Sequence, residues 1–234
     1  MGEQMILIDR RFRGPPDSGN GGYVAGMLAK AIGGSNVEVT LRAPPPLDTP
    51  LRLVSRDDGA ELMSGDALIA SAVRTAVELE VPPPPTLSQA RAAAARFSGF
   101  DQHNFPGCFV CGPERGVGDG LRIFPGATET EEEQVAGIWT PDPSLSDDGG
   151  RPTVEHVWAA LDCAGYFAVR ERAGIAVLGR IAALVARVPN IGEPTIVTGW
   201  TIASDGRKHR AGTALHDRNA TLLAMAAATW LTIG

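Results

Sequence analysis

Residues 20–31, NGGYVAGMLAKA, carry the strongest fold signal in the chain. Apolar side chains recur at the spacing of one helix face: Tyr23, Met27, Leu28 and Ile32. Asn20 is a suitable N-cap, with Ser18 as an alternative, and Gly33-Gly34 is a typical helix stop. The segment therefore predicts a helix over 20–32 that begins at a Gly-Gly pair.

A second segment, residues 153–164 with the sequence TVEHVWAALDCA, aligns with residues 20–31 without a gap. Apolar residues coincide at position 24 with 157, 27 with 160 and 28 with 161. We therefore predict a second helix over 154–172 and interpret the two helices as copies of a duplicated unit.

Strand-like runs surround both helices and are separated by turn signals such as Asp57-Asp58-Gly59. The predicted strands are 5–11, 37–43, 51–55, 60–63, 67–73, 121–124, 134–139, 176–188, 195–203, 209–216 and 222–233. Each half thus combines a helix with antiparallel strands, which is an α+β pattern with a helix covering one face of a sheet.

A proline run, Val81 to Pro85, separates the two halves, because four consecutive prolines cannot continue a helix or a central strand. An Ala- and Arg-rich stretch, 87–97, follows it and predicts a short helix. We therefore expect an N-terminal domain over 1–80, a linker over 81–105 and a C-terminal domain over 106–234.

The composition is that of an ordinary globular protein, with 234 residues and a formal net charge of -6. This charge gives no general reason to bind nucleic acid. No apolar run is long enough for a membrane span, and residues 1–13 lack the pattern of a signal peptide. Together with an odd number of cysteines, 3, these features lead us to expect a cytoplasmic protein.

Several motifs resemble those of hotdog-fold thioesterases. The Gly-Gly helix start at 20–25 resembles theirs, as do the segment CFVCGP at 108–113 with GLRI at 120–123, and the last hairpin, 206–230. Two such units in one chain are similar to the double-hotdog acyl-CoA thioesterases. The resemblance implies tandem hotdog domains, each a long helix wrapped by a curved antiparallel sheet, with ligands bound at the junction. It also implies an acyl-CoA thioester as partner and no cofactor beyond the coenzyme A moiety of that substrate. Exposed sheet edges in a double hotdog often pair further, so a monomer and a homo-oligomer both stay open.

Thioester hydrolysis needs donors for the carbonyl oxygen and a base or nucleophile. Gly21 and Gly22 lie at a helix start, where backbone N–H groups are unpaired, and Asn20 is placed to orient a substrate. Asp162 lies within an apolar helical stretch, and the resemblance also implies an acid on this helix. The first helix has Ala29 where the second has Asp162, so we predict one composite site per chain. The alternatives are a simple loop-to-helix junction at the glycines and a structural buried carboxylate at Asp162.

Further substrate contacts are predicted at Thr153 and His156, and at the basic cluster of Arg207, Lys208 and Arg210, which is suited to phosphates. A structural interpretation is also open for these residues: His156 as a helix-surface residue, and the basic cluster as a solvated hairpin end. Asp147 and Asp148 lie in a loop just before the second helix.

Cys108 and Cys111 have CxxC spacing, but a closed zinc site needs two more ligands, and His103 is the only one near in sequence. We therefore interpret the two cysteines as structural thiols and expect no metal.

Three other functions compete with thioesterase, and the first is a pure interaction module in which both helices are only structural. The second is a protein of the same fold that binds an acyl group without catalysis, because a fold does not determine function. The absence of a Gln from 224–228, where the resemblance implies an Asp plus Gln/Thr set, weakens transfer of the long-chain thioesterase mechanism. The third is a hotdog dehydratase or hydratase. Such an enzyme uses an Asp and a His that lie close together, and in this chain His156 and Asp162 are the pair to test.

Overall fold

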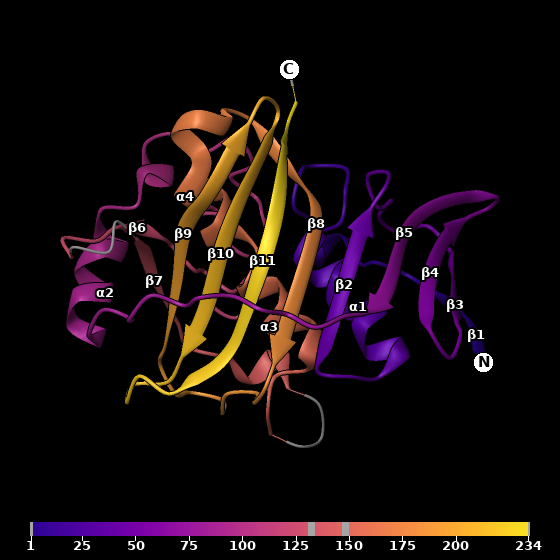
Figure 1. Ribbon diagram of the computed structural model, residues 1–234, viewed down its shortest axis with the longest axis horizontal. Coiled ribbons are helices and arrows are strands. Elements are labelled where there is room, and N and C mark those ends of the chain that lie inside the picture. The colour runs from indigo at the N-terminus through magenta and orange to yellow at the C-terminus, as the bar shows by residue number, and fades with distance from the viewer. Residues whose placement is uncertain (1, 131–133, 147–149, 234) are drawn as a thin grey trace.

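The computed structural model describes residues 2–130, 134–146 and 150–233 (Figure 1). These residues form an 11-stranded antiparallel sheet in the order β1-β3-β4-β5-β2-β8-β11-β10-β9-β7-β6. The strands are β1 (Gly2–Ile6), β2 (Asn36–Leu41), β3 (Leu51–Ser55), β4 (Gly59–Ser64), β5 (Ala67–Arg74), β6 (Gly126–Ala127), β7 (Val135–Trp139), β8 (Ala176–Val185), β9 (Thr195–Asp205), β10 (Lys208–His216) and β11 (Leu222–Thr232).

The principal helices lie behind the sheet in the view of Figure 1. They are α1 (Gly21–Ile32), α2 (Leu87–Ala95), α3 (Val154–Ala160) and α4 (Cys163–Ala173). Helix α1 packs against β2, β4 and β5, and α4 packs against β9 and β10. The predicted helix over 20–32 is confirmed, and the short helix expected at 87–97 ends at Ala95. Among the described residues, no helix combines the length and the apolar character needed to cross a membrane.

The sheet is continuous across the middle of the molecule because β2 pairs with β8. The register of this antiparallel pair runs from Asn36 opposite Leu184 to Thr40 opposite Arg180. Of the strands before this seam, β2, β4 and β5 pack against α1, and of those after it, β9 and β10 pack against α4. The chain is therefore organised as two helix-on-sheet halves that share one sheet.

Helices α1 and α3 cross at two glycines of α1. A methyl group on Gly26 would lie 2.6 Å from Cα of Glu155, and one on Gly22 would lie 3.1 Å from Cα of Ala159. In the alignment of 20–31 with 153–164, position 22 corresponds to 155 and position 26 to 159. Exchanging the two helices therefore turns the contact between 26 and 155 into the contact between 22 and 159. The helices are thus related by a local two-fold axis, and the absence of side chains lets their backbones come close together.

The second predicted helix is not continuous, which corrects the expected single helix over 154–172. Helix α3 ends at Ala160 and α4 begins at Cys163. The hydroxyl of Thr213 in β10 donates a 2.8 Å hydrogen bond to the carbonyl of Leu161, and the amide of Gly165 bonds instead to the carbonyl of Asp162. Competition from a side chain is an established cause of helix kinks, and here it places Asp162 at the break.

Two predicted strands are also corrected. The first ends at Ile6, and Arg10–Phe12 forms a 3-10 turn that is capped by the Asp9 carboxylate. Residues 121–124 are not a strand because Arg122 has a φ of 54°, outside the extended region. The amides of Leu121 and Ile123 donate instead to the carbonyls of Phe109 and Val110, which fixes the loop that carries the CxxC sequence.

The connection between β5 and α2 crosses the face of the sheet opposite the helices (Figure 1). Val77, Leu79 and Val81 pack there against a small cluster that contains Trp200 and Met225. The intervening Glu78 and Glu80 are exposed. This alternation, visible in the sequence as VELEV, allows an extended segment to cover the outer face of the C-terminal half.

Candidate active site

The start of α1 holds a buried carboxylate that belongs to the other half of the chain. Asn20 caps the helix by accepting the amide of Tyr23 at 2.9 Å, and its Nδ2 donates to Oδ2 of Asp162 at 2.7 Å. The backbone amide of Gly22 donates to the same oxygen at 3.0 Å. The structure therefore brings Asp162 to Asn20 and Gly22, from which it is separated by 142 and 140 positions in the sequence.

Glycine at position 22 is a steric requirement of this contact. A methyl group there would lie 2.7 Å from both Cβ of Asp162 and the carbonyl oxygen of Trp158. Gly22 was predicted as a donor to substrate, but its amide is already bonded to Asp162. Gly21, the first residue of α1, lies on the pocket wall instead.

Asp162 is 2% exposed, and its burial raises the pKa of the carboxyl to about 7. The Gly22 amide and the Asn20 side chain oppose this rise in the pKa because they stabilise the ionised form. Both bonds go to Oδ2, whereas Oδ1 is buried without a hydrogen-bond partner among the described residues. The protein therefore fixes the orientation of the carboxylate through one of its two oxygens.

A pocket of about 370 Å³ opens beside this carboxylate, and we call it the junction pocket. Both halves and the loop between them line it. Its lining includes Asn20, Gly21, Arg42, His103, Cys108, Cys111, Asp162, Cys163 and Tyr166. Its wall is largely apolar with a few polar groups, which is the usual character of a small-molecule site. A smaller hollow of about 210 Å³, near Arg187 and Asp217, contains none of the predicted site residues.

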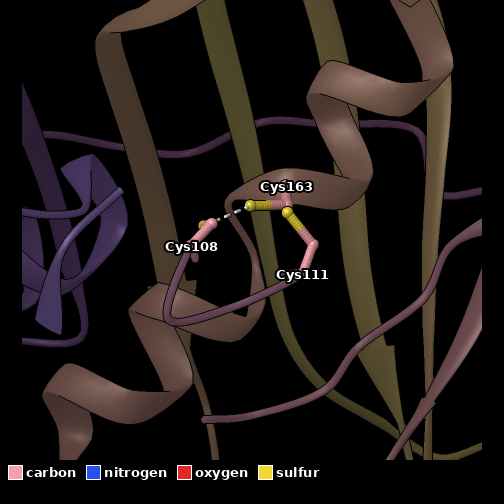
Figure 2. Close-up of side chains that lie close together, drawn as sticks. All are labelled: Cys108, Cys111 and Cys163. Carbon is pink, nitrogen blue, oxygen red and sulfur yellow. Dashed lines mark hydrogen bonds between the residues drawn. The ribbon is translucent and has the colours of Figure 1, made fainter. Parts of the chain in front are cut away.

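Three cysteine side chains gather on one part of the wall (Figure 2). The Sγ atoms of Cys108 and Cys163 are 3.8 Å apart, and all three cysteines are free and buried. Hydrogen bonds from the thiols of Cys111 and Cys163 hold the pKa of Cys108 well below its usual value, against the effect of burial. The sequence indicated the CxxC pair but not Cys163, whose position next to the buried acid was the available signal.

Thr153 and His156 lie away from the junction pocket, and neither is among the described residues of its wall. The Thr153 hydroxyl is 3.0 Å from Nδ1 of His156, and the imidazole packs against the rings of Phe12, Tyr23 and Phe109. Burial lowers the pKa of His156 to about 4. The structure thus gives His156 a packing environment at the helix crossing rather than contact with a pocket ligand.

The predicted basic cluster is on the surface, at the turn between β9 and β10. Arg207, Lys208 and Arg210 are exposed, and Arg207 donates to the carbonyl of Thr232 at 2.9 Å. Arg42 is instead the one Arg or Lys on the described wall of the junction pocket. Sequence reasoning missed it because a single arginine before a proline run has no distinctive pattern. Asp147 and Asp148 lie outside the described residues.

The start of α3 differs from that of α1. Glu155 occupies the place that aligns with Gly22. Its Oε1 forms an ion pair with Nζ of Lys30, at a distance of 2.8 Å. Thr153 makes no side-chain capping bond. The second helix start therefore holds a structural ion pair where the first holds a buried carboxylate beside a pocket.

No protein-family model and no curated protein sequence matches the chain. Solved structures do. The tesB protein of Mycobacterium avium subsp. paratuberculosis has a TM-score of 0.65 at 13% identity, over 99% of this chain and 93% of its own. A provisionally assigned thioesterase from Novosphingobium aromaticivorans has a TM-score of 0.66 at 12% identity, over 99% and 96%.

A third structure carries the name of the fold. It is a conserved protein of unknown function with a hot dog fold from Alicyclobacillus acidocaldarius, with a TM-score of 0.63 at 10% identity over 99% and 93%. At these identities the likeness establishes architecture, and the chain has a hotdog fold. In architecture it is similar over its whole length to thioesterase-type hotdog proteins, which confirms the resemblance seen in the sequence.

Proposed function

We propose that the chain is a tandem of two hotdog units, over 1–80 and 106–234 with a linker over 81–105, and that it hydrolyses acyl-CoA thioesters in the junction pocket. The tandem arrangement is supported by the local two-fold axis between α1 and α3 and by the β2–β8 seam. The hydrolase is supported by thioesterase-type neighbours of the same architecture. We expect the protein in the cytoplasm, in keeping with its three free cysteines.

One observation carries the proposed chemistry. Asp162 is buried on the pocket wall with Oδ2 bonded to Asn20 and Gly22, and Oδ1 has no partner among the described residues. We assign the role of general base to Oδ1, which requires a water molecule to reach it from the junction pocket and give up a proton to it. The water oxygen then adds to the thioester carbonyl carbon, the carbon–sulfur bond breaks, and the departing thiolate receives the proton from Asp162.

The oxyanion formed in this reaction needs a donor. The first N–H groups of a helix have no partner within the helix, and Gly21 begins α1 on the pocket wall. We therefore assign the Gly21 amide to the oxyanion and the Gly22 amide to the orientation of Asp162. Removing one such donor costs about 10²–10³ in rate in a well-studied protease.

Coenzyme A also carries phosphates. Arg42 is the cation that we place nearest to them, since it belongs to the pocket wall. Arg207, Lys208 and Arg210 remain a proposed outer contact: Arg207 bonds to Thr232, whose neighbour Ile233 lines the pocket. His156 and Thr153 have no assigned role in catalysis.

A dehydratase is the second candidate, and a specific observation supports it. A dehydratase domain of a mycocerosic acid synthase-like PKS has a TM-score of 0.61 at 14% identity over 99% of this chain. His103 and Asp162 lie on the wall of the same pocket. This replaces His156 as the histidine that such a reaction would use.

A panel of acyl-CoA thioesters separates these functions. Free thiol released in proportion to acid formed is the result expected of the hydrolase. Hydration of an enoyl-CoA without thiol release would identify the dehydratase type, and saturable binding without either product would identify a non-catalytic binder.

A further inference from the structure

The wall of the junction pocket contains all the cysteines of the chain. The sequence has 3, and their Sγ atoms lie within 4.8 Å of one another although Cys163 is far along the chain from the other two (Figure 2). We call Cys108, Cys111 and Cys163 the thiol cluster.

The spacing of these sulfurs is that of ligands around a tetrahedral metal ion. Zinc–thiolate bonds of about 2.3 Å at tetrahedral angles place the sulfurs about 3.8 Å apart. Cys108 and Cys163 have an Sγ–Sγ distance of 3.8 Å. The remaining pairs lie inside the 4.8 Å limit, so small side-chain movements bring the third sulfur to the same ion.

The backbone holds the CxxC loop in a fixed turn. The amide of Gly112 donates to the carbonyl of Cys108 at 2.9 Å, and the amide of Phe109 donates to the carbonyl of Arg13 at 2.8 Å. A methyl group on Gly112 would lie 2.4 Å from the carbonyl oxygen of Pro106, so the turn is too tight for a side chain. C-x-x-C is the shortest common ligand spacing of zinc sites.

The thiol cluster lies at a helix start, since Cys163 is the first residue of α4, an 11-residue helix. The Nδ2 group of Asn20 lies 4.0 Å from Sγ of Cys108. An iron–sulfur cluster held by cysteines requires four of them, and this sequence has 3.

We propose that the thiol cluster binds one Zn²⁺ ion with three protein ligands. Among the described residues, no fourth side-chain ligand atom lies within the same 4.8 Å group. Because the cluster lines the junction pocket, the fourth position faces the pocket and is taken by water or by a pocket ligand. This proposal does not depend on thioesterase activity.

The test uses the full chain, reduced and handled without oxygen. Zinc is measured by elemental analysis after dialysis, and binding is measured by competition with a chromogenic chelator. We expect about one zinc per chain for the wild type. Cys163→Ser should weaken binding by at least the roughly 10- to 100-fold that second-shell changes produce. Tyr166→Phe is the matched control, since Tyr166 lies on the same helix and wall but offers no thiolate.

Cobalt substitution of the wild type avoids reliance on a variant that fails to fold. Bound Co²⁺ should give thiolate-to-cobalt charge-transfer bands and the visible bands of a four-coordinate ion. Absence of these bands, no zinc retained by the reduced wild type, or wild-type zinc binding in a folded Cys163→Ser protein would each overturn the proposal. None of these readouts requires turnover, so they test the proposed metal site independently of the proposed hydrolase activity.

Discussion

The starts of α1 and α3 occupy equivalent places in the two halves, yet they hold different chemistry. At α1, Asn20 caps the helix and Gly22 leaves room for Asp162, a buried residue of the junction pocket wall. At α3, Glu155 fills the place of Gly22 and forms an ion pair with Lys30. The two aligned helix starts therefore differ at one residue position: glycine leaves room for an acid from the other half of the chain, whereas glutamate supplies an acid of its own that is paired with Lys30.

The largest difference between the two starts should appear in catalysis. We expect Asp162→Asn to lower kcat for the best thioester by about 10²–10³, within the usual range for loss of a general base. The change keeps the side-chain shape, so circular dichroism should be unaltered.

Glu155→Gln is the matched control at the α3 start, because it removes a carboxylate that is paired with Lys30. Its kcat should equal that of the wild type. An Asp162→Asn protein with wild-type turnover, or a comparable loss in Glu155→Gln, would remove the distinction between the starts.

The second difference is in the response of stability to pH. His156 aligns with Tyr23, and burial lowers the pKa of its imidazole to about 4, compared with about 6.5 when unfolded. Between these pH values the unfolded chain binds a proton that the folded chain does not. The contribution of His156 to the free energy of unfolding therefore falls as pH drops from about 6.5 to about 4, by about 3 kcal/mol at most, whereas Asp162, whose pKa is raised to about 7, contributes with the opposite sign.

The groups facing this imidazole act in both directions. Glu155 raises the pKa of His156, whereas Arg11 from the N-terminal segment and Lys30 from α1 lower it, and the Tyr23 ring packs against it. His103 and His216 have lowered pKa values and contribute with the same sign. The test is the difference between wild type and His156→Gln in denaturant unfolding at pH 7 and pH 5. We expect a shallower pH dependence in the variant, and an identical dependence would refute this account of His156.

A third comparison concerns the steric role of glycine at the α1 start. Gly22→Ala should lower the free energy of unfolding by about 1–3 kcal/mol, the usual effect of overpacking, because the new methyl group meets Asp162 and Trp158. Gly116→Ala is the control, since a methyl group there has no neighbour within 4 Å. Equal stability of the two variants would show that the contact at Gly22 is looser than the structure indicates.

The smallest effect concerns the phosphates of the substrate. We expect Arg42→Ala to raise KM by about two- to five-fold at low salt, since exposed ion pairs contribute about 0.2–1 kcal/mol. Arg210→Ala, on the β9–β10 hairpin, should raise KM less. The opposite order would move the coenzyme A contact to the hairpin.

Much of the fold was predictable because its signals are local. The helix at 20–32, the strand at 51–55 and most of the C-terminal strands follow from periodicity and turn residues. The break in the second helix at Leu161 was not predictable, because it depends on the hydroxyl of Thr213, which is 52 residues away in the sequence. A helical pattern in the sequence carries no information about such a distant competitor for a backbone carbonyl.

The candidate site also contains residues that the sequence predicts and residues that it does not. Asn20, Gly22 and Asp162 stood out as a helix start and an acid in an apolar stretch, and the structure places them within hydrogen-bonding distance. Cys163 joins the other two cysteines through tertiary packing, and Arg42 reaches the pocket through the course of a proline-rich loop. Neither placement leaves a pattern in the sequence.

The central claim is that the chain holds one composite site and not two. Isothermal titration of the wild type with a non-hydrolysable acyl-CoA thioether measures the number of sites directly. The account predicts one ligand bound per chain, and two equivalent ligands per chain would contradict it.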